Sequence, residues 1–88
     1  MKRPELKIQD IDGMEYNAPP VTLGLLAALE KKTGKPFSQL STYSMEDWIV
    51  LGAAWLKLSE QTIADKFESF VLVKAFTTRL QEAQATQT

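Results

Sequence analysis

The sequence of 88 residues contains no cysteine and no histidine. The first absence excludes disulfides and thiolate nucleophiles, and both together exclude imidazole bases and zinc sites built on sulfur or imidazole. An excess of one charge is also lacking, because 10 Lys and Arg residues stand against 11 Asp and Glu residues. Affinity that comes from neutralising phosphates is therefore not expected. We expect no catalytic residues, no metal site and no cofactor, and nucleic acid is not the expected partner.

Long apolar runs are absent as well. The longest, over residues 48–56, is far shorter than the roughly 20 residues that span a bilayer. The start of the chain is polar and basic, and it leads into no apolar segment typical of a signal peptide. We therefore expect one cytoplasmic domain over residues 1–80 that makes no membrane contact. Residues 81–88 are predicted to form a disordered tail, because their Gln, Ala and Thr offer nothing large to bury.

A β-hairpin is predicted near the start of the chain. Apolar and polar residues alternate there, and an Asp and Gly pair at residues 12–13 marks a turn. A two-residue turn would divide the apolar residues between both faces of the hairpin. A three-residue turn over residues 11–13, with its glycine in the left-handed region, pairs Ile8 with Tyr16 instead. This second register is the one that we predict, because it gives the hairpin a single buried face. That face consists of Leu6, Ile8, Met14 and Tyr16.

Helical spacing begins after the two prolines at residues 19–20, which end the second strand. Leucines three to four positions apart predict a helix over residues 22–33, and Gly34 supplies its stop signal. A further short turn is predicted over residues 37–40. The fold class is therefore mainly α with a minor β component, in which an N-terminal hairpin precedes three to four helices in a small bundle.

The central helix is predicted to begin at a capping box over residues 44–47, in which a serine and an aspartate bond each other's backbone. Its two adjacent acids are explained by this cap and by the positive end of the helix, so we assign them no catalytic role. Residues 48–56 contain no polar side chain other than the indoles, which predicts a helix surrounded by other elements. Trp48 and Trp55 are predicted to lie in the core rather than to line a ligand pocket.

A final helix is predicted over residues 60–84, with a new start at Ser59. Its apolar residues form two stripes, of which one is expected to contact the central helix. The other stripe has no obvious partner within so short a chain, which favours an interaction surface, although the hairpin is an alternative cover. The hypothesised partner-binding residues are Phe70, Val73, Phe76 and Leu80.

Two further features have structural interpretations. The Asp and Gly pair at residues 12–13 lacks the alternating acids and the closing glutamate of a calcium loop, so it is interpreted as a turn. Basic residues occur in two groups, and they leave a second functional hypothesis open: a small regulatory adaptor that binds a peptide or nucleic acid. These groups consist of Lys2, Arg3 and Lys7, and of Lys31, Lys32 and Lys35.

The order of these features resembles that of the small tail assembly chaperones of long-tailed bacteriophages and related prophages. The resemblance covers about residues 8–58. Three stretches carry it: Asp12, Gly13, Met14, Glu15 and Tyr16; then Leu29, Glu30, Thr33 and Gly34; then Ser44, Asp47 and Trp48.

The resemblance implies a protein without enzymatic activity that works in the cytoplasm of the bacterial host and is absent from the mature virion. Its implied partner is the tape measure protein, a long and largely helical client, with the tail tube protein as a further partner. It also implies self-association into an oligomer. Such chaperones are made in two lengths by frameshifting, so this chain would correspond to the short form or to an N-terminal domain.

Overall fold

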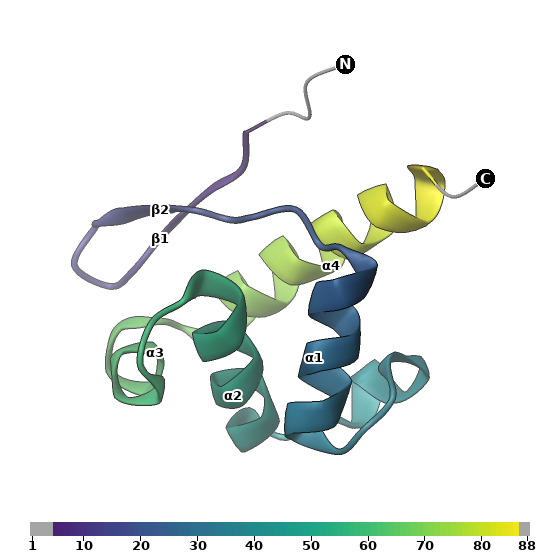
Figure 1. Ribbon diagram of the computed structural model, residues 1–88. Helices are drawn as coiled ribbons and strands as arrows, with labels where there is room; N and C mark the ends of the chain where they lie inside the picture. The colour runs from purple at the N-terminus through teal and green to yellow at the C-terminus, as the bar shows by residue number, and fades with distance from the viewer. Residues whose placement is uncertain (1–4, 87–88) are drawn as a thin grey trace.

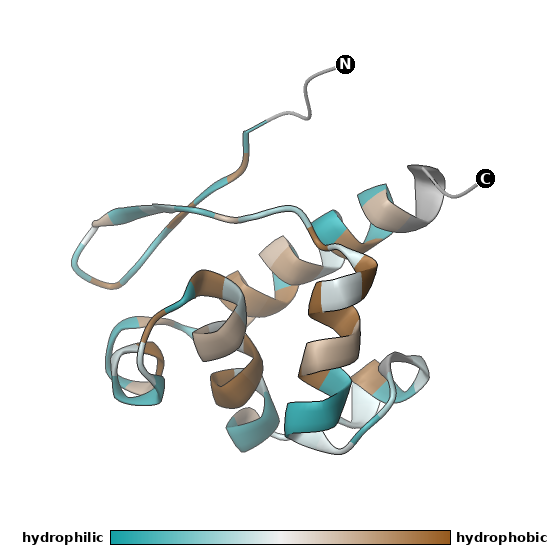
Figure 2. Cartoon of the chain, viewed as in Figure 1, coloured by the Kyte–Doolittle hydropathy of each residue, from teal (hydrophilic) through white to brown (hydrophobic). Residues whose placement is uncertain are grey.

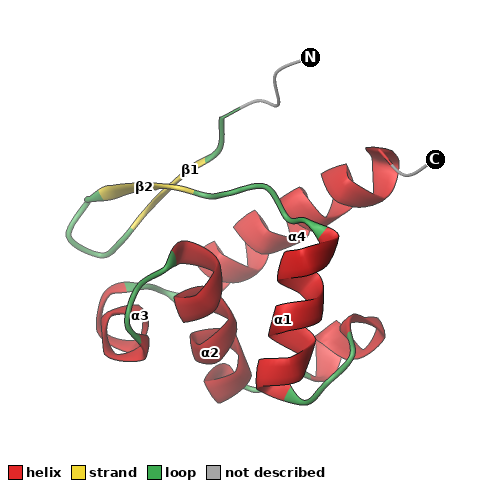
Figure 3. Ribbon diagram, viewed as in Figure 1, coloured by secondary structure: helices red, strands yellow, loops and turns green. Residues whose placement is uncertain are grey.

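The computed structural model describes the backbone of residues 5–86 and the side chains of residues 5–36 and 38–83. It is a mainly α fold with one small hairpin, as the sequence predicts (Figures 1 and 3). In Figure 2 the hydrophobic residues run along α1, along α2 and along the first half of α4. The elements in chain order are β1 (Lys7–Gln9), β2 (Glu15–Asn17), α1 (Leu23–Thr33), η1 (Phe37–Thr42), α2 (Met45–Leu56), α3 (Glu60–Lys66) and α4 (Ser69–Thr86).

The hairpin has the predicted register, since β1 and β2 are antiparallel with Ile8 opposite Tyr16. The turn is closed by a hydrogen bond of 3.0 Å from the Asp10 N–H to the Met14 carbonyl, and Gly13 has a φ of 84°. Ile8 is buried, and Tyr16 is half-buried. Met14 lies beside the turn and is 61% exposed, so the prediction of a buried Met14 is wrong.

The first helix and the short turn lie where the sequence places them. Thr22 caps α1 through a hydrogen bond of 3.2 Å from the Leu25 N–H, and Gly34 ends the helix with a φ of 73°. The predicted turn over residues 37–40 is observed as the longer 3₁₀ segment η1.

The central position of α2 is confirmed, because this helix contacts α1, α3 and α4. Its start is the predicted capping box. The Asp47 N–H donates to the Ser44 hydroxyl at 3.2 Å, and the Ser44 N–H donates to the Asp47 carboxylate at 2.9 Å. Trp48 and Trp55 are both buried, which confirms their assignment to the core. Asp47 therefore serves as part of the cap of α2.

The predicted single helix over residues 60–84 is instead two helices, α3 and α4, because Phe67 adopts an extended conformation. In a continuous helix the Lys66 carbonyl would accept the Phe70 N–H. It accepts the Ile11 N–H of the hairpin at 2.8 Å instead. The Phe67 ring contacts Tyr16, with ring centroids 5.1 Å apart. Hairpin contacts therefore accompany the break, and no glycine or proline marks it in the sequence.

The predicted disordered tail over residues 81–88 is also corrected. Helix α4 continues to Thr86, so residues 81–86 are helical, and residues 87–88 lie outside the described residues.

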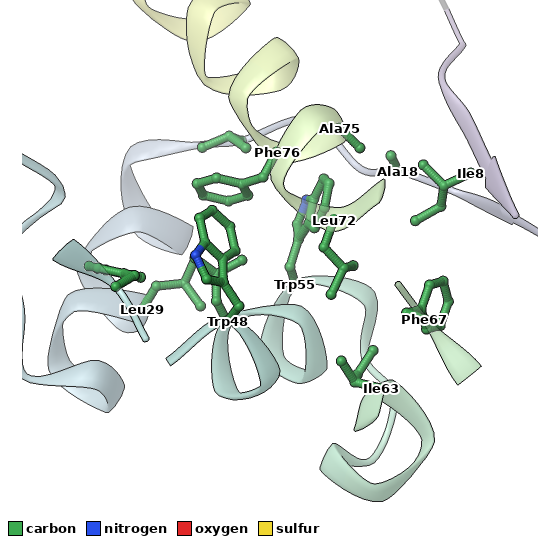
Figure 4. Packing of buried hydrophobic residues seen from close by; sticks show 13 residues of the cluster. Ile8, Ala18, Leu29, Trp48, Trp55, Ile63, Phe67, Leu72, Ala75 and Phe76 are labelled. Atoms are coloured by element: carbon green, nitrogen blue, oxygen red, sulfur yellow. The ribbon is translucent and has the colours of Figure 1, made fainter. Parts of the chain in front are cut away.

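The core centres on the contact between α2 and α4. Figure 4 shows Phe76 of α4 directed toward the two indoles of α2. Its ring is perpendicular to that of Trp55, with centroids 5.2 Å apart, and lies edge to face with Trp48 at 6.1 Å. Such contacts stabilise beyond the area that they bury. Phe76 therefore joins the two long helices.

Two side chains fix the linker between the hairpin and α1. The Arg79 Nε donates to the Ala18 carbonyl at 2.9 Å, and the Trp55 Nε1 donates to the Pro19 carbonyl at 3.0 Å. The linker therefore satisfies two consecutive buried carbonyls through side chains, because no strand lies there to do so.

Candidate functional site

A hollow lies between the hairpin and α4, and we call it the β1–α4 groove. Its volume is about 610 Å³. It has apolar walls with charged side chains of both signs among them. The apolar lining residues are Leu6, Ile8, Phe70, Val71 and Ala75, and the charged ones are Lys7, Asp10, Glu15, Glu68 and Lys74.

The four hypothesised partner-binding residues do not share one exposed face. Phe70 is 63% exposed and lines the groove. Val73 and Leu80 are half-buried and contact the core. Phe76 is fully buried between the indoles, so its assignment to a partner surface is wrong. Phe70 is thus the one hypothesised residue that presents a large apolar surface.

The error has a physical source in the buried face of α4. That face follows helical spacing but includes an arginine, which is 3% exposed and donates to Ala18 and Glu82. Arginine is rarely buried, so a prediction from apolar residues alone does not count Arg79 as part of the buried face of α4 and assigns that face to other residues. The residues of the buried face are Leu72, Ala75, Phe76 and Arg79.

The hairpin residues of the groove were not part of the sequence hypothesis. The alternation at residues 6–8 did indicate a buried side, and the hairpin was an alternative cover for the second stripe of the final helix, but the sequence did not decide between this cover and an interaction surface. Only the tertiary contact between β1 and α4 brings Ile8 beside Ala75 at the groove.

One of the three acids that line the groove, Asp10, is held in its charged form. The carboxylate of Asp10 accepts hydrogen bonds of 2.9–3.0 Å from the N–H groups of Asp12 and Met14 and from the Tyr16 hydroxyl. Burial acts to raise the pKa of Asp10, but these three hydrogen bonds outweigh it, and the pKa is lowered. A carboxylate with a lowered pKa and three donors is a structural anchor of the turn rather than a proton acceptor for catalysis.

Two ion pairs connect segments that are distant in the sequence. The Lys66 Nζ lies 2.7 Å from the Asp12 carboxylate, and this hydrogen bond raises the pKa of Lys66. The Lys35 Nζ lies 2.6 Å from the Asp47 carboxylate and, together with the Ser44 N–H, lowers the pKa of Asp47. The first pair joins the turn of the hairpin to α3, and the second joins the segment after α1 to α2.

The basic residues do not gather into one patch over the described chain. Lys7 lies on β1, whereas Lys31 and Lys32 lie at the far end of α1, well apart from the hairpin in Figure 1. Lys35 is engaged in the ion pair with Asp47. Lys2 and Arg3 lie outside the described residues. The geometry therefore gives no support to the adaptor hypothesis.

A second, smaller hollow of about 280 Å³ lies among α2, α3 and α4. Met45 lines it and is 67% exposed. Among the side chains that the structure describes, no three Cys, His, Asp or Glu residues gather as a metal site would require. Across residues 5–86, every helix is too short or too polar to cross a membrane.

Comparison with known proteins adds no relative. The chain matches no model of a protein family, no curated protein and no solved structure.

Proposed function

We propose that this protein is a non-enzymatic tail assembly chaperone of a long-tailed bacteriophage or prophage, which binds the helical tape measure protein and also binds itself. It would act in the cytoplasm of the host and be absent from the mature virion. The single observation that carries the proposal is the β1–α4 groove, an open hollow with apolar walls and charges of both signs. The resemblance over residues 8–58 supplies the class of client.

A helical client suits the groove for a physical reason. An amphipathic helix presents one apolar stripe, which needs apolar walls, and charged flanks, which need charges of either sign nearby. The groove offers the half-buried Leu6 and Val71 for the stripe and Lys7, Glu68 and Lys74 for the flanks. Binding a helix in this way needs neither a cofactor nor a group that changes its protonation, which supports a role in binding rather than in catalysis.

Phe70 is the proposed anchor of the client. It is the large apolar residue of the groove with the most surface to bury, since 63% of it is exposed. Burying a phenylalanine side chain fully contributes about 1.5–3 kcal/mol, and every 1.4 kcal/mol changes affinity tenfold. Losing this anchor should therefore weaken client binding by about one to two orders of magnitude.

The test compares two aspartate variants. Phe70→Asp and Leu23→Asp both replace an exposed apolar residue in the first turn of a helix, but only Phe70 lines the groove. Each variant is co-expressed with the tape measure protein, and the complex is quantified by co-purification and by calorimetry. We expect Phe70→Asp to lose the client and Leu23→Asp to retain it. Equal retention by both variants would contradict the groove, and a wild-type chain that captures no tape measure protein would contradict the function.

A salt titration separates this proposal from the adaptor hypothesis. Apolar contact at Phe70 predicts that the affinity changes little with ionic strength. Affinity that falls steeply as salt rises would favour binding through the basic residues instead.

A further inference from the structure

The outer edge of β1 carries backbone groups that bond to nothing else in the described chain. The even-numbered residues over 6–10 exchange their backbone hydrogen bonds with β2 and its flanks. The N–H and C=O groups of Lys7 and Gln9 therefore point away from β2. Farther along the same edge, the outward N–H of Ile11 donates to the Lys66 carbonyl. The edge is therefore occupied at Ile11 and open at Lys7 and Gln9.

The open part of this edge faces free space. Lys7, Ile8 and Gln9 line the β1–α4 groove, and the side chains of Lys7 and Gln9 are exposed whereas that of Ile8 is buried. The sheet itself has only two strands of three residues, which is near the lower limit of what is stable alone. An added strand would satisfy the outward groups and extend the sheet, as in recognition by β-augmentation.

We propose that β1 of a second copy of this chain occupies the edge, antiparallel to the first, with Leu6 opposite Leu6. The proposal rests on the proposed function in one respect, since it names the surface of the self-association. It makes a four-stranded sheet with a twofold axis perpendicular to it, and both α4 helices lie on the same face of that sheet.

Charge complementarity selects this register. Glu5 and Lys7 are both exposed, and alternation places them on the same face of the strand. Centring the twofold axis on Lys7 would place two lysines opposite each other, which is unfavourable. Centring it on Ile8 would oppose Lys7 to Gln9, which is neutral. Centring it on Leu6 opposes Glu5 to Lys7 of the second copy, and the twofold axis repeats that pair.

The same register satisfies the backbone. Glu5 and Lys7 are the positions whose backbone groups point outward, so each opposed pair exchanges two hydrogen bonds and the twofold axis gives four. The two half-buried Leu6 side chains meet on the face toward α4, beside the apolar walls of the groove. Because the strand of the second copy enters the groove that also holds Phe70, self-association and client binding compete.

The test is a charge exchange read by sedimentation equilibrium. Wild type should form a dimer, and Lys7→Glu and Glu5→Lys should each weaken it by at least tenfold, because each opposes like charges twice. The double variant, Glu5→Lys with Lys7→Glu, restores both opposite-charge pairs and should dimerise as wild type does. Circular dichroism controls for folding, which should be unchanged because both side chains are exposed. A double variant that stays monomeric, or single variants that dimerise normally, would overturn the register.

Cross-linking gives an independent readout, because the chain has no native cysteine. In the proposed register the two Leu6 Cα atoms are about 4.5 Å apart, within the range of a disulfide, so Leu6→Cys should cross-link on mild oxidation. The two Gln9 Cα atoms are about 20 Å apart along the strands, so Gln9→Cys should not. The reverse pattern would overturn the proposal.

The two proposals can fail separately. Glu5→Lys, at an exposed residue that does not line the groove, should be monomeric and should bind the tape measure protein at least as tightly as wild type, since its competitor is removed. A wild-type chain that captures the client but stays monomeric at about millimolar concentration would overturn the β1 pairing and leave the chaperone function standing. A dimer with the predicted charge dependence that captures no client would do the opposite.

Discussion

Phe70 and Phe76 are the same residue type on the same helix, and their replacement by alanine should have opposite consequences. Phe76 is fully buried between two indoles, whereas Phe70 is 63% exposed. We predict that Phe76→Ala destabilises the fold and that Phe70→Ala leaves the fold intact while weakening client binding.

The magnitude follows from the packing. Removing a buried phenylalanine ring costs about 3–5 kcal/mol, because the lost transfer free energy is added to that of the cavity. A chain of this length has a total free energy of unfolding of about 4–13 kcal/mol. Phe76→Ala therefore removes a large share of the stability. The milder Phe76→Leu loses two edge-to-face contacts, each of about 0.5–1.5 kcal/mol, and should cost about 1–3 kcal/mol.

The assay is urea unfolding followed by far-UV circular dichroism. With a slope of about 1–2 kcal/mol per molar urea, Phe76→Leu should lower the midpoint by about 0.5–3 M. In thermal unfolding the same loss should lower the Tm by at least roughly 4 °C. Phe70→Ala should shift the free energy of unfolding by no more than about 0.5 kcal/mol, as exposed substitutions do.

Equal stability of the Phe70 and Phe76 variants would refute this reasoning, because it would mean that both rings have similar surroundings. A Phe76→Ala variant that stays stable but no longer binds the client would support the assignment of Phe76 to the partner surface. Client binding by Phe76→Leu at a urea concentration where it stays folded should equal that of wild type.

Three further predictions concern single groups. Asp10 has a lowered pKa, so its contribution to stability is present above the unfolded pKa of about 3.9 and is lost as the pH falls through the folded pKa. Asp10→Asn should therefore flatten the fall in urea midpoint as the pH drops below about 4, and an unchanged slope would contradict this. Arg79→Leu leaves the Ala18 carbonyl without its guanidinium donor and should lower the free energy of unfolding by about 1–3 kcal/mol in the same urea assay, and an unchanged midpoint would contradict the buried hydrogen bond. Lys57 ends α2 with a φ of 58°, so Lys57→Gly should raise the Tm by a few degrees, equivalent to about 0.5–1 kcal/mol, and a lower Tm would argue against the left-handed conformation.

Features that depend on neighbours in the sequence were predictable. The hairpin register follows from Gly13 and from the alternation of apolar residues, and the start of α2 follows from the capping box at Ser44. The burial of Trp48 and Trp55 follows from a helix with almost no polar side chain. Each of these inferences needs only local geometry and the requirement that apolar surface be covered.

Features that depend on a distant contact were not predictable. The break at Phe67 accompanies a hydrogen bond between Lys66 and Ile11, more than fifty positions apart, and no local residue marks it. The orientation of α4 depends on Arg79, whose burial is compensated by the Ala18 carbonyl and the Glu82 carboxylate. A sequence pattern that treats arginine as exposed therefore rotates α4 and places Phe76 outside.

The absence of cysteine and histidine and the spacing of the apolar residues are properties of the chain, so they predict the mainly α fold and exclude thiol and imidazole chemistry before any folding is considered. The buried face of α4 and the residues that meet in the groove depend instead on tertiary contacts. Ile8 of β1 and Phe70 of α4 come to line one groove because hydrogen bonds between distant segments hold the hairpin against the helices.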